Sequence, residues 1–292
     1  MLEFLGALGN ADLPFLRYAF LAGLLSSVAF GIVGSYVVVR RISYIAGAIS
    51  HSVLGGIGLG LYLQVAAGWG WCHPIYGAVA AALVAAVAIG LVSLHARQRE
   101  DTVIGAFWAV GMAVGLLFLA RTPGYIDPMS YLFGNILLIS RSDLWLVLAL
   151  DVLVVAIALA FYNRFLAVCF DEEFARVRGL RVELYFLLLL CLTALTVVLL
   201  VRVVGIVMVI ALLTLPAAVA GLFARRLWQM MLAAMLLCML FVAVGLALSY
   251  TRDLPSGPTI ILVAGAAYLL ALLLARLLRR PGRAPRAIAD GR

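Results

Sequence analysis

The chain of 292 residues is 66% hydrophobic and only 12% charged. Soluble domains are about 45–50% apolar and about 25% charged, so this composition excludes a soluble globular protein and indicates a protein embedded in a membrane. The net charge is +8, carried by 21 arginines without a single lysine. Because these arginines lie beside apolar stretches, they indicate membrane topology and not nucleic-acid binding.

Nine apolar stretches are long enough to cross a bilayer, which takes about 20 helical residues. The sequence therefore predicts an all-α, polytopic transmembrane helix bundle that forms one domain over residues 1–280. Eight spans remain possible if residues 184–224 contain a re-entrant pair. The predicted spans are residues 16–39, 44–66, 75–95, 102–119, 143–162, 184–201, 204–224, 227–250 and 257–278.

The arginines are distributed unevenly between the two sets of connections. One set, with the C-terminal tail, holds sixteen of the 21 arginines, and the other set holds five. By the positive-inside rule the first set is cytoplasmic, so the N-terminus is outside and the C-terminus inside. Residues 281–292 are predicted to be a disordered cytoplasmic tail, with contact to anionic lipid headgroups as the alternative.

His51 lies about two turns inside the second predicted span, directly after Ser50. Ionisable side chains within a span are costly, face the protein interior and mark transport pathways. The neutral imidazole is a common ligand of zinc and other transition metals. We therefore predict that Ser50 and His51 line a path for a metal ion. A histidine bonded to a neighbouring carbonyl group is the alternative.

Two segments interrupt the apolar pattern. Residues 120–142 are broken by prolines and glycines and predict an external loop with a short helix at membrane depth. Pro216, in the sequence Thr214-Leu215-Pro216, removes one backbone hydrogen bond from a later span and kinks it. Broken helices are tolerated where they line a cavity or are buried in protein. A path-lining role and simple curvature are therefore both open for Thr214 and Pro216.

Asp151 is the single charged residue near the middle of the fifth predicted span. A charge at that depth costs at least about 2.5–3.5 kcal/mol, so a partner is expected. Our hypothesis is that Asp151 supplies negative charge to the path. A protonated or hydroxyl-paired aspartate of structural use is the alternative.

A charged segment lies between the fifth and sixth spans, within a loop over about residues 163–183. It carries six charges of both signs between residues 171 and 181. Connections between helices usually need only a few residues, so the segment predicts a docking surface for a soluble partner. A solvated loop is the alternative. The residues of this surface are Asp171, Glu172, Glu173, Phe174, Ala175, Arg176 and Gly179.

The pattern Glu173-Phe174-Ala175-x-x-x-Gly179 resembles the Glu-Ala-Ala-x-x-x-Gly loop of ABC importer permeases. Further stretches resemble the zinc/manganese-type ABC uptake permeases in the same order along the chain. They are residues 34–43 (GSYVVVRRIS), 50–56 (SHSVLGG), 100–105 (EDTVIG), 131–137 (YLFGNIL), 170–179 (FDEEFARVRG), 204–207 (VGIV) and 211–217 (ALLTLPA).

This resemblance implies a permease subunit that imports a divalent transition metal. It implies two cytoplasmic ATPases, an external metal-binding protein and a second permease copy, with no stably bound cofactor. The charged segment becomes a cytoplasmic coupling helix, and Asn135 joins Thr214 and Pro216 on the path. Since the chain lacks lysine, it has no GxxxxGK[ST] phosphate-binding loop, so we expect that it is not itself an ATPase. An intramembrane enzyme is the least favoured alternative, because the sequence shows no Ser/His/Asp set, no HExxH motif and no pair of catalytic carboxylates.

One departure from the family pattern concerns the metal. The family usually has an acid four residues before the histidine, on the same helix face, and this chain has Gly47 there. Without that carboxylate the site favours zinc over manganese, because manganese prefers carboxylate oxygens. Manganese and iron stay open. The main alternative to an ABC permease is a stand-alone secondary carrier or channel, which would more typically show several intramembrane charges and a repeat.

Overall fold

The computed structural model describes residues 6, 14–95, 100–124, 128–134 and 141–278. In this part of the chain every regular element is a helix, and nine helices are long and apolar enough to cross a membrane. The all-α class is confirmed, and nine is the higher of the two predicted span numbers. The nine helices are α2 (Pro14–Val39), α3 (Ser43–Val65), α4 (Pro74–His95), α5 (Glu100–Arg121), α7 (Arg141–Ala160), α10 (Val182–Val204), α11 (Ile206–Phe223), α12 (Leu227–Arg252) and α13 (Ser256–Leu278).

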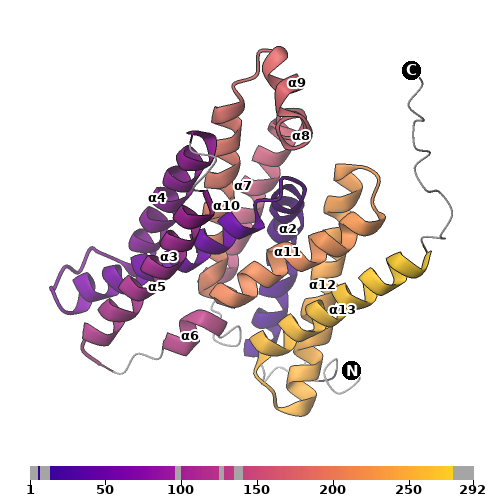
Figure 1. Cartoon of the computed structure of the whole chain (residues 1–292). Coiled ribbons are helices and arrows are strands. Elements are labelled where there is room, and N and C mark those ends of the chain that lie inside the picture. The colour runs from indigo at the N-terminus through magenta and orange to yellow at the C-terminus, as the bar shows by residue number, and fades with distance from the viewer. Residues whose placement is uncertain (1–5, 7–13, 96–99, 125–127, 135–140, 279–292) are drawn as a thin grey trace, which may run out of the picture.

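Helices α2 and α3 form the interior of the bundle. Figure 1 shows α3, α4 and α5 gathered on one flank, and α11, α12 and α13 on the other. Helix α2 packs against α11 and α12 of the second group and against α7. A hydrophobic window of α3 is 78% buried, whereas that of α5 is 17% buried. A polar side chain on α3 therefore faces protein, and much of α5 is left for lipid or a partner.

Glycines bring α3 close to both of its neighbours. A Cβ atom on Gly55 would lie 2.9 Å from the carbonyl oxygen of Gly111 on α5, and one on Gly60 would lie 2.9 Å from Cα of Pro74 on α4. Backbones approach this closely in membrane bundles where the interface carries small residues. The later part of α3 is thus closed against α4 and α5, with the rings of Tyr62 and Phe118 meeting beyond the glycines at 5.3 Å between centroids.

The predicted short helix in residues 120–142 is confirmed as α6 (Pro128–Phe133). Gly134 follows it with φ 70° and lies against the break between α10 and α11, where Gly205 has φ 83°. Both glycines adopt the left-handed region that they favour. Asn135 and the predicted tail 281–292 lie outside the described residues.

The charged segment forms two short helices, α8 (Tyr162–Phe170) and α9 (Glu172–Val177), at one end of the bundle (Figure 1). Two arginine-bearing connections, α2–α3 and α11–α12, lie at the same end. Val39, Phe170 and Arg226 line one hollow of about 350 Å³ there. We call this end, with Arg40, α9 and Arg226, the arginine-rich end; the arginine distribution predicts that it is cytoplasmic.

Candidate functional site

His51 is almost completely enclosed by protein. Its side chain is 7% exposed, and its Nδ1 atom is buried without a hydrogen-bond partner. Buried polar atoms are nearly always paired, so an orphaned ring nitrogen is a feature that calls for a ligand. In the tautomer with the proton on Nε2, Nδ1 offers its lone pair to a metal ion. The alternative to metal binding was a hydrogen bond from His51 to a neighbouring carbonyl group, and Nδ1 makes no such bond.

The imidazole of His51 stacks on an aromatic ring of α5. The ring centroids of His51 and Trp108 are 4.3 Å apart, and the ring planes differ by 25°. Such an aromatic pair contributes about 0.5–1.5 kcal/mol beyond the area that it buries. The stack fixes the plane of the imidazole, and hence the direction in which its nitrogens point.

The serines beside His51 are bonded within the protein. The Ser50 hydroxyl donates to the Ala46 carbonyl at 2.9 Å, and Ser50 is fully buried. The Ser52 hydroxyl contacts the carbonyls of Ala48, at 2.8 Å, and of Phe107 on α5, at 3.1 Å. Ser52 therefore ties α3 to α5 next to Trp108, whereas the proton of Ser50 is committed to its own helix.

Asp151 lies on α7 against α2. Its Oδ1 atom accepts a hydrogen bond from the Ala29 backbone N–H at 3.2 Å, and its buried Oδ2 atom has no partner. The structure thus gives Asp151 and His51 separate neighbours, α2 for the first and α5 for the second. A role of Asp151 in the path stays a hypothesis that mutation must decide.

The interrupted helix α11 contains both remaining path candidates. The Thr214 hydroxyl donates to the Ile210 carbonyl one turn earlier at 2.8 Å, and Pro216 is buried inside the helix. A threonine bonded in this way and a proline both bend helices. Among the described residues, no three His, Cys, Asp or Glu side chains gather into a group that could hold a metal ion.

Helix α9 has a defined start and a defined end. The Asp171 side chain accepts a hydrogen bond from the Phe174 N–H at 2.9 Å and caps the first turn. At the other end, Leu180 N–H bonds to the Ala175 carbonyl and Gly179 N–H to the Arg176 carbonyl, with Gly179 at φ 75°. This is a Schellman motif, which favours glycine at the left-handed position.

One face of α9 is anchored and the other is open. Ala175 is fully buried, whereas Phe174 is 50% exposed and Val177 is 87% exposed. Arg178 lies over the Phe174 ring at 5.0 Å. Exposed apolar side chains with charges around them, outside the membrane spans, are typical of a docking surface.

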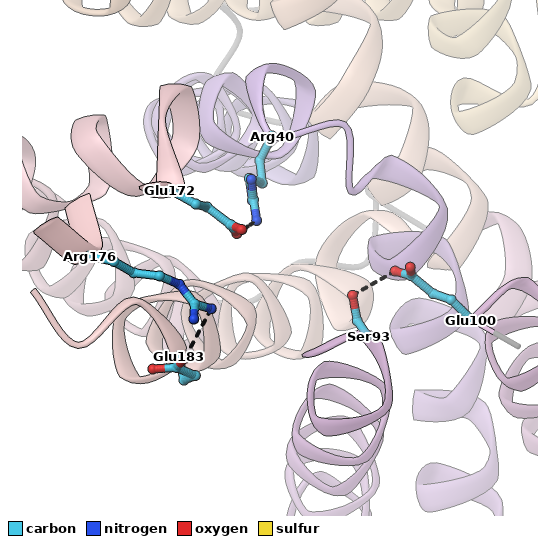
Figure 2. A network of polar contacts seen from close by, with 6 residues as sticks. All are labelled: Arg40, Ser93, Glu100, Glu172, Arg176 and Glu183. Atoms are coloured by element: carbon cyan, nitrogen blue, oxygen red, sulfur yellow. Dashed lines mark hydrogen bonds and ion pairs between the residues drawn. The ribbon is translucent and has the colours of Figure 1, made fainter. Parts of the chain in front are cut away.

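An ion pair joins α9 to the connection between α2 and α3. Arg40, directly after α2, pairs with Glu172, and both side chains are partly buried. Figure 2 shows this pair together with the Arg176–Glu183 pair, at 3.1 Å, and the hydrogen bond from Ser93 to Glu100, at 2.7 Å. Helix α9 is therefore linked to the turn from which α3 and His51 continue.

The surroundings of Arg40 are only partly open to water. Burial lowers the pKa of the Arg40 guanidinium below its usual value, while Cys169 and Glu100 act to raise it. Burial also raises the pKa of the Cys169 thiol to about 12, an effect that the Arg40 charge partly opposes. At neutral pH the thiol is protonated and the guanidinium charged, so Arg40 is available to pair with Glu172.

Comparison with known proteins decides the family. A family model described as the ABC 3 transport family matches residues 12–275. The chain belongs to the ABC 3 transport family. It is similar to MntC, a manganese transport system membrane protein of Listeria innocua, at 32% identity over 267 residues, which cover 91% of this chain and 93% of that protein. A protein of Chlamydia trachomatis, named a probable metal transport system membrane protein, is 39% identical over 264 residues, with 90% of each chain covered.

A solved structure agrees with this family. The fold matches a chain of PsaBC from Streptococcus pneumoniae in complex with Fab, with a TM-score of 0.81 and 27% identity, over 92% of this chain and 94% of that chain. The ABC 3 chain is thus the multi-pass membrane permease of a metal ABC transporter and not an enzyme. Membership implies separate ATPase and binding-protein partners, and it decides against a stand-alone carrier.

Two features of the site were not predicted from the sequence. Trp108 was not singled out, because its meeting with His51 depends on how α5 packs on α3. The Arg40–Glu172 pair joins residues 132 positions apart. The available signal for the stack was Trp108 itself, a large aromatic residue at helical spacing from the small residues Gly105 and Gly111.

Proposed function

We propose that this permease imports a divalent transition-metal ion, zinc in the first place, along a path that includes His51. The observation that carries the proposal is the buried Nδ1 atom of His51, which has no partner in the protein. A neutral imidazole nitrogen is a good ligand for zinc. An external binding protein delivers the ion, and ATP-driven closure of separate ATPases opens the path alternately to the two sides.

The coupling helix α9 is proposed to dock in a groove of the ATPase. Its exposed Phe174 and Val177 supply apolar contact, and its charged residues supply complementarity. The anchored face, with Ala175 and the Arg40–Glu172 pair, transmits the movement to α2 and α3. A second copy of the chain is proposed to complete the transport unit, one copy for each ATPase.

We propose zinc ahead of manganese because of the ligand atoms that the site around His51 offers. Gly47 leaves no carboxylate one turn before His51, and zinc accepts nitrogen ligands more readily than manganese does. Manganese is the second candidate, because a relative at 32% identity is named a manganese transport protein. Asp151, Thr214, Pro216 and Asn135 are further proposed path residues, and Ser50 supports His51 from within α3.

The test is uptake by the reconstituted system. The permease is placed in proteoliposomes with its ATPase and its binding protein, and zinc or manganese uptake is measured with and without ATP. The proposal expects ATP-dependent uptake, with zinc preferred when both ions compete. ATP-dependent import of manganese alone would reverse the choice of metal, and the lack of uptake of either ion would contradict metal import.

A further inference from the structure

Two rings of α3 hold Trp108 in place. The ring centroid of His51 lies 4.3 Å from that of Trp108, and the centroid of Tyr44 lies 5.8 Å from it, with the ring planes tilted by 36°. The hydrogen bond from Ser52 to the Phe107 carbonyl secures the α5 backbone at the adjacent residue. These contacts hold the indole in one position beside the imidazole.

The indole of Trp108 has room beside α3 because residue 47 is glycine. A Cβ atom on Gly47 would lie 2.6 Å from Cζ3 of Trp108, closer than side-chain carbons come in folded proteins. Tyr44, Gly47 and His51 follow one another at spacings of three and four residues and so share one face of α3. Any side chain at position 47 would have to push the indole off His51.

One turn from His51, α3 offers an ion no side-chain ligand, and the hydroxyls of the adjacent Ser50 and Ser52 are bonded to backbone carbonyls. The α3 residues one turn before and one turn after His51 are Gly47, Ala48, Leu54 and Gly55. None of these side chains carries a ligating atom. The one nitrogen ligand that α3 offers an ion here is therefore the imidazole of His51, backed by the indole of Trp108.

The indole also suits a metal-bound imidazole chemically. A metal ion on Nδ1 withdraws electron density from the ring and makes it more cationic. The face of tryptophan is the best aromatic partner for positive charge. Groups that orient a ligating histidine from the outer shell commonly change metal affinity by about 10–100-fold.

We propose that Trp108 is the positioning and specificity-determining residue for the ion bound by His51. Its ring fixes the orientation of the imidazole and occupies the place beside Gly47, so that no second α3 ligand joins. The site then favours ions that accept nitrogen ligands, such as zinc, over manganese, which prefers carboxylate oxygens. This inference rests on the proposed metal path through His51.

The first test uses Trp108 as its own reporter in the purified full-length chain. The paramagnetic ion Co²⁺ quenches the fluorescence of a tryptophan that it approaches, and the chain has five tryptophans. We expect a saturable part of the quenching to be lost in Trp108→Phe and in His51→Ala. It should persist in Trp145→Phe, the matched control, which removes an indole that is 71% exposed on α7. Equal quenching of wild type and Trp108→Phe would overturn the proposal.

The second test separates positioning from folding in the reconstituted transporter. Trp108→Ala is expected to raise KM for zinc about tenfold, to leave the maximal rate nearly unchanged, and to reduce the preference for zinc over manganese. Trp108→Phe, which keeps a ring on the imidazole, should restore most of the affinity.

The outcomes distinguish a failure of this proposal from a failure of the proposed function on which it rests. Unchanged KM and unchanged preference in Trp108→Ala, while the wild type imports zinc, would overturn the role of Trp108 and leave the proposed function standing. If the wild type imports no metal, the proposed function fails, and the cobalt experiment still decides whether an ion binds beside Trp108.

Discussion

Gly47 lies one helical turn before His51, and the indole of Trp108 fills the space beside it. We predict that Gly47→Ala lowers zinc affinity about tenfold, because the added methyl group displaces the indole from the imidazole. In a Trp108→Ala background the same change should have little further effect, since the two residues act through one contact. Zinc titration of the purified variants measures both.

The control for this prediction is Gly265→Ala on α13, where a Cβ atom would meet nothing within 4 Å. It adds the same methyl group to a membrane helix and should leave zinc binding unchanged. Independent, additive losses from Gly47→Ala and Trp108→Ala would show that the residues do not act through the stack.

Asp151 offers a second prediction at the residue scale. Asp151→Asn keeps an oxygen that can accept from the Ala29 N–H and removes only the charge. If the carboxylate supports the path, zinc uptake should fall about tenfold, the loss usual for a supporting group. Uptake equal to wild type at the same membrane abundance would make Asp151 a structural residue of the α2–α7 contact.

At the scale of elements, the ion pair between Arg40 and Glu172 connects α9 with the α2–α3 turn. Each single reversal, Arg40→Glu or Glu172→Arg, is predicted to reduce metal imported per ATP about tenfold, because a charged hydrogen bond of about 1.5–3 kcal/mol is lost. The double reversal should recover most of the loss. The ratio of uptake to ATP hydrolysis is the measurement.

The exposed pair of Arg176 and Glu183 supplies the comparison. Its side chains are 55% and 50% exposed, and pairs of this kind contribute about 0–1 kcal/mol. Glu183→Gln should therefore change the uptake ratio little. A double reversal at Arg40 and Glu172 that transports no better than the single variants would contradict the proposed linkage.

The Schellman turn at the end of α9 gives a further prediction. Gly179→Asp forces a side chain into φ 75° and adds charge to the docking surface, although the surrounding space is open. A left-handed residue other than glycine costs up to about 1–2 kcal/mol, and aspartate tolerates this region better than most residues, so uptake should fall by up to about tenfold at unchanged membrane abundance.

Gly68→Asp is the matched control, because Gly68 has φ 72° and open space in the α3–α4 connection. It should leave the coupling of ATP hydrolysis to uptake unchanged. Equal effects of the two substitutions would mean that Gly179 serves only the fold of its loop.

The sequence predicted the elements well and their contacts poorly. The spans and the short helix α6 follow from local patterns of hydropathy, proline and glycine. The stack of Trp108 on His51 and the pairing of Arg40 with Glu172 depend on which helices become neighbours. That choice rests on the close approach of backbones at glycines such as Gly55 and Gly111, whose partners a single sequence does not specify.

At the scale of the whole molecule, the candidate metal residue and the coupling helix are joined by one short run of chain. Arg40 pairs with Glu172 of α9. Helix α3 begins three residues later, at Ser43, and His51 lies about two turns into it. Helices transmit such displacements as rigid bodies. A movement of α9 on the ATPase would therefore reach the imidazole through α3 without crossing the rest of the bundle.

The most direct measurement is competitive uptake of zinc and manganese in proteoliposomes that contain the ATPase and the binding protein. Wild type is compared with His51→Ala, with His95→Ala as control, since His95 bonds the Leu91 carbonyl at the end of α4. The account predicts ATP-dependent zinc uptake that is lost in His51→Ala and kept in His95→Ala. Zinc uptake that persists in His51→Ala would contradict a metal path through this histidine.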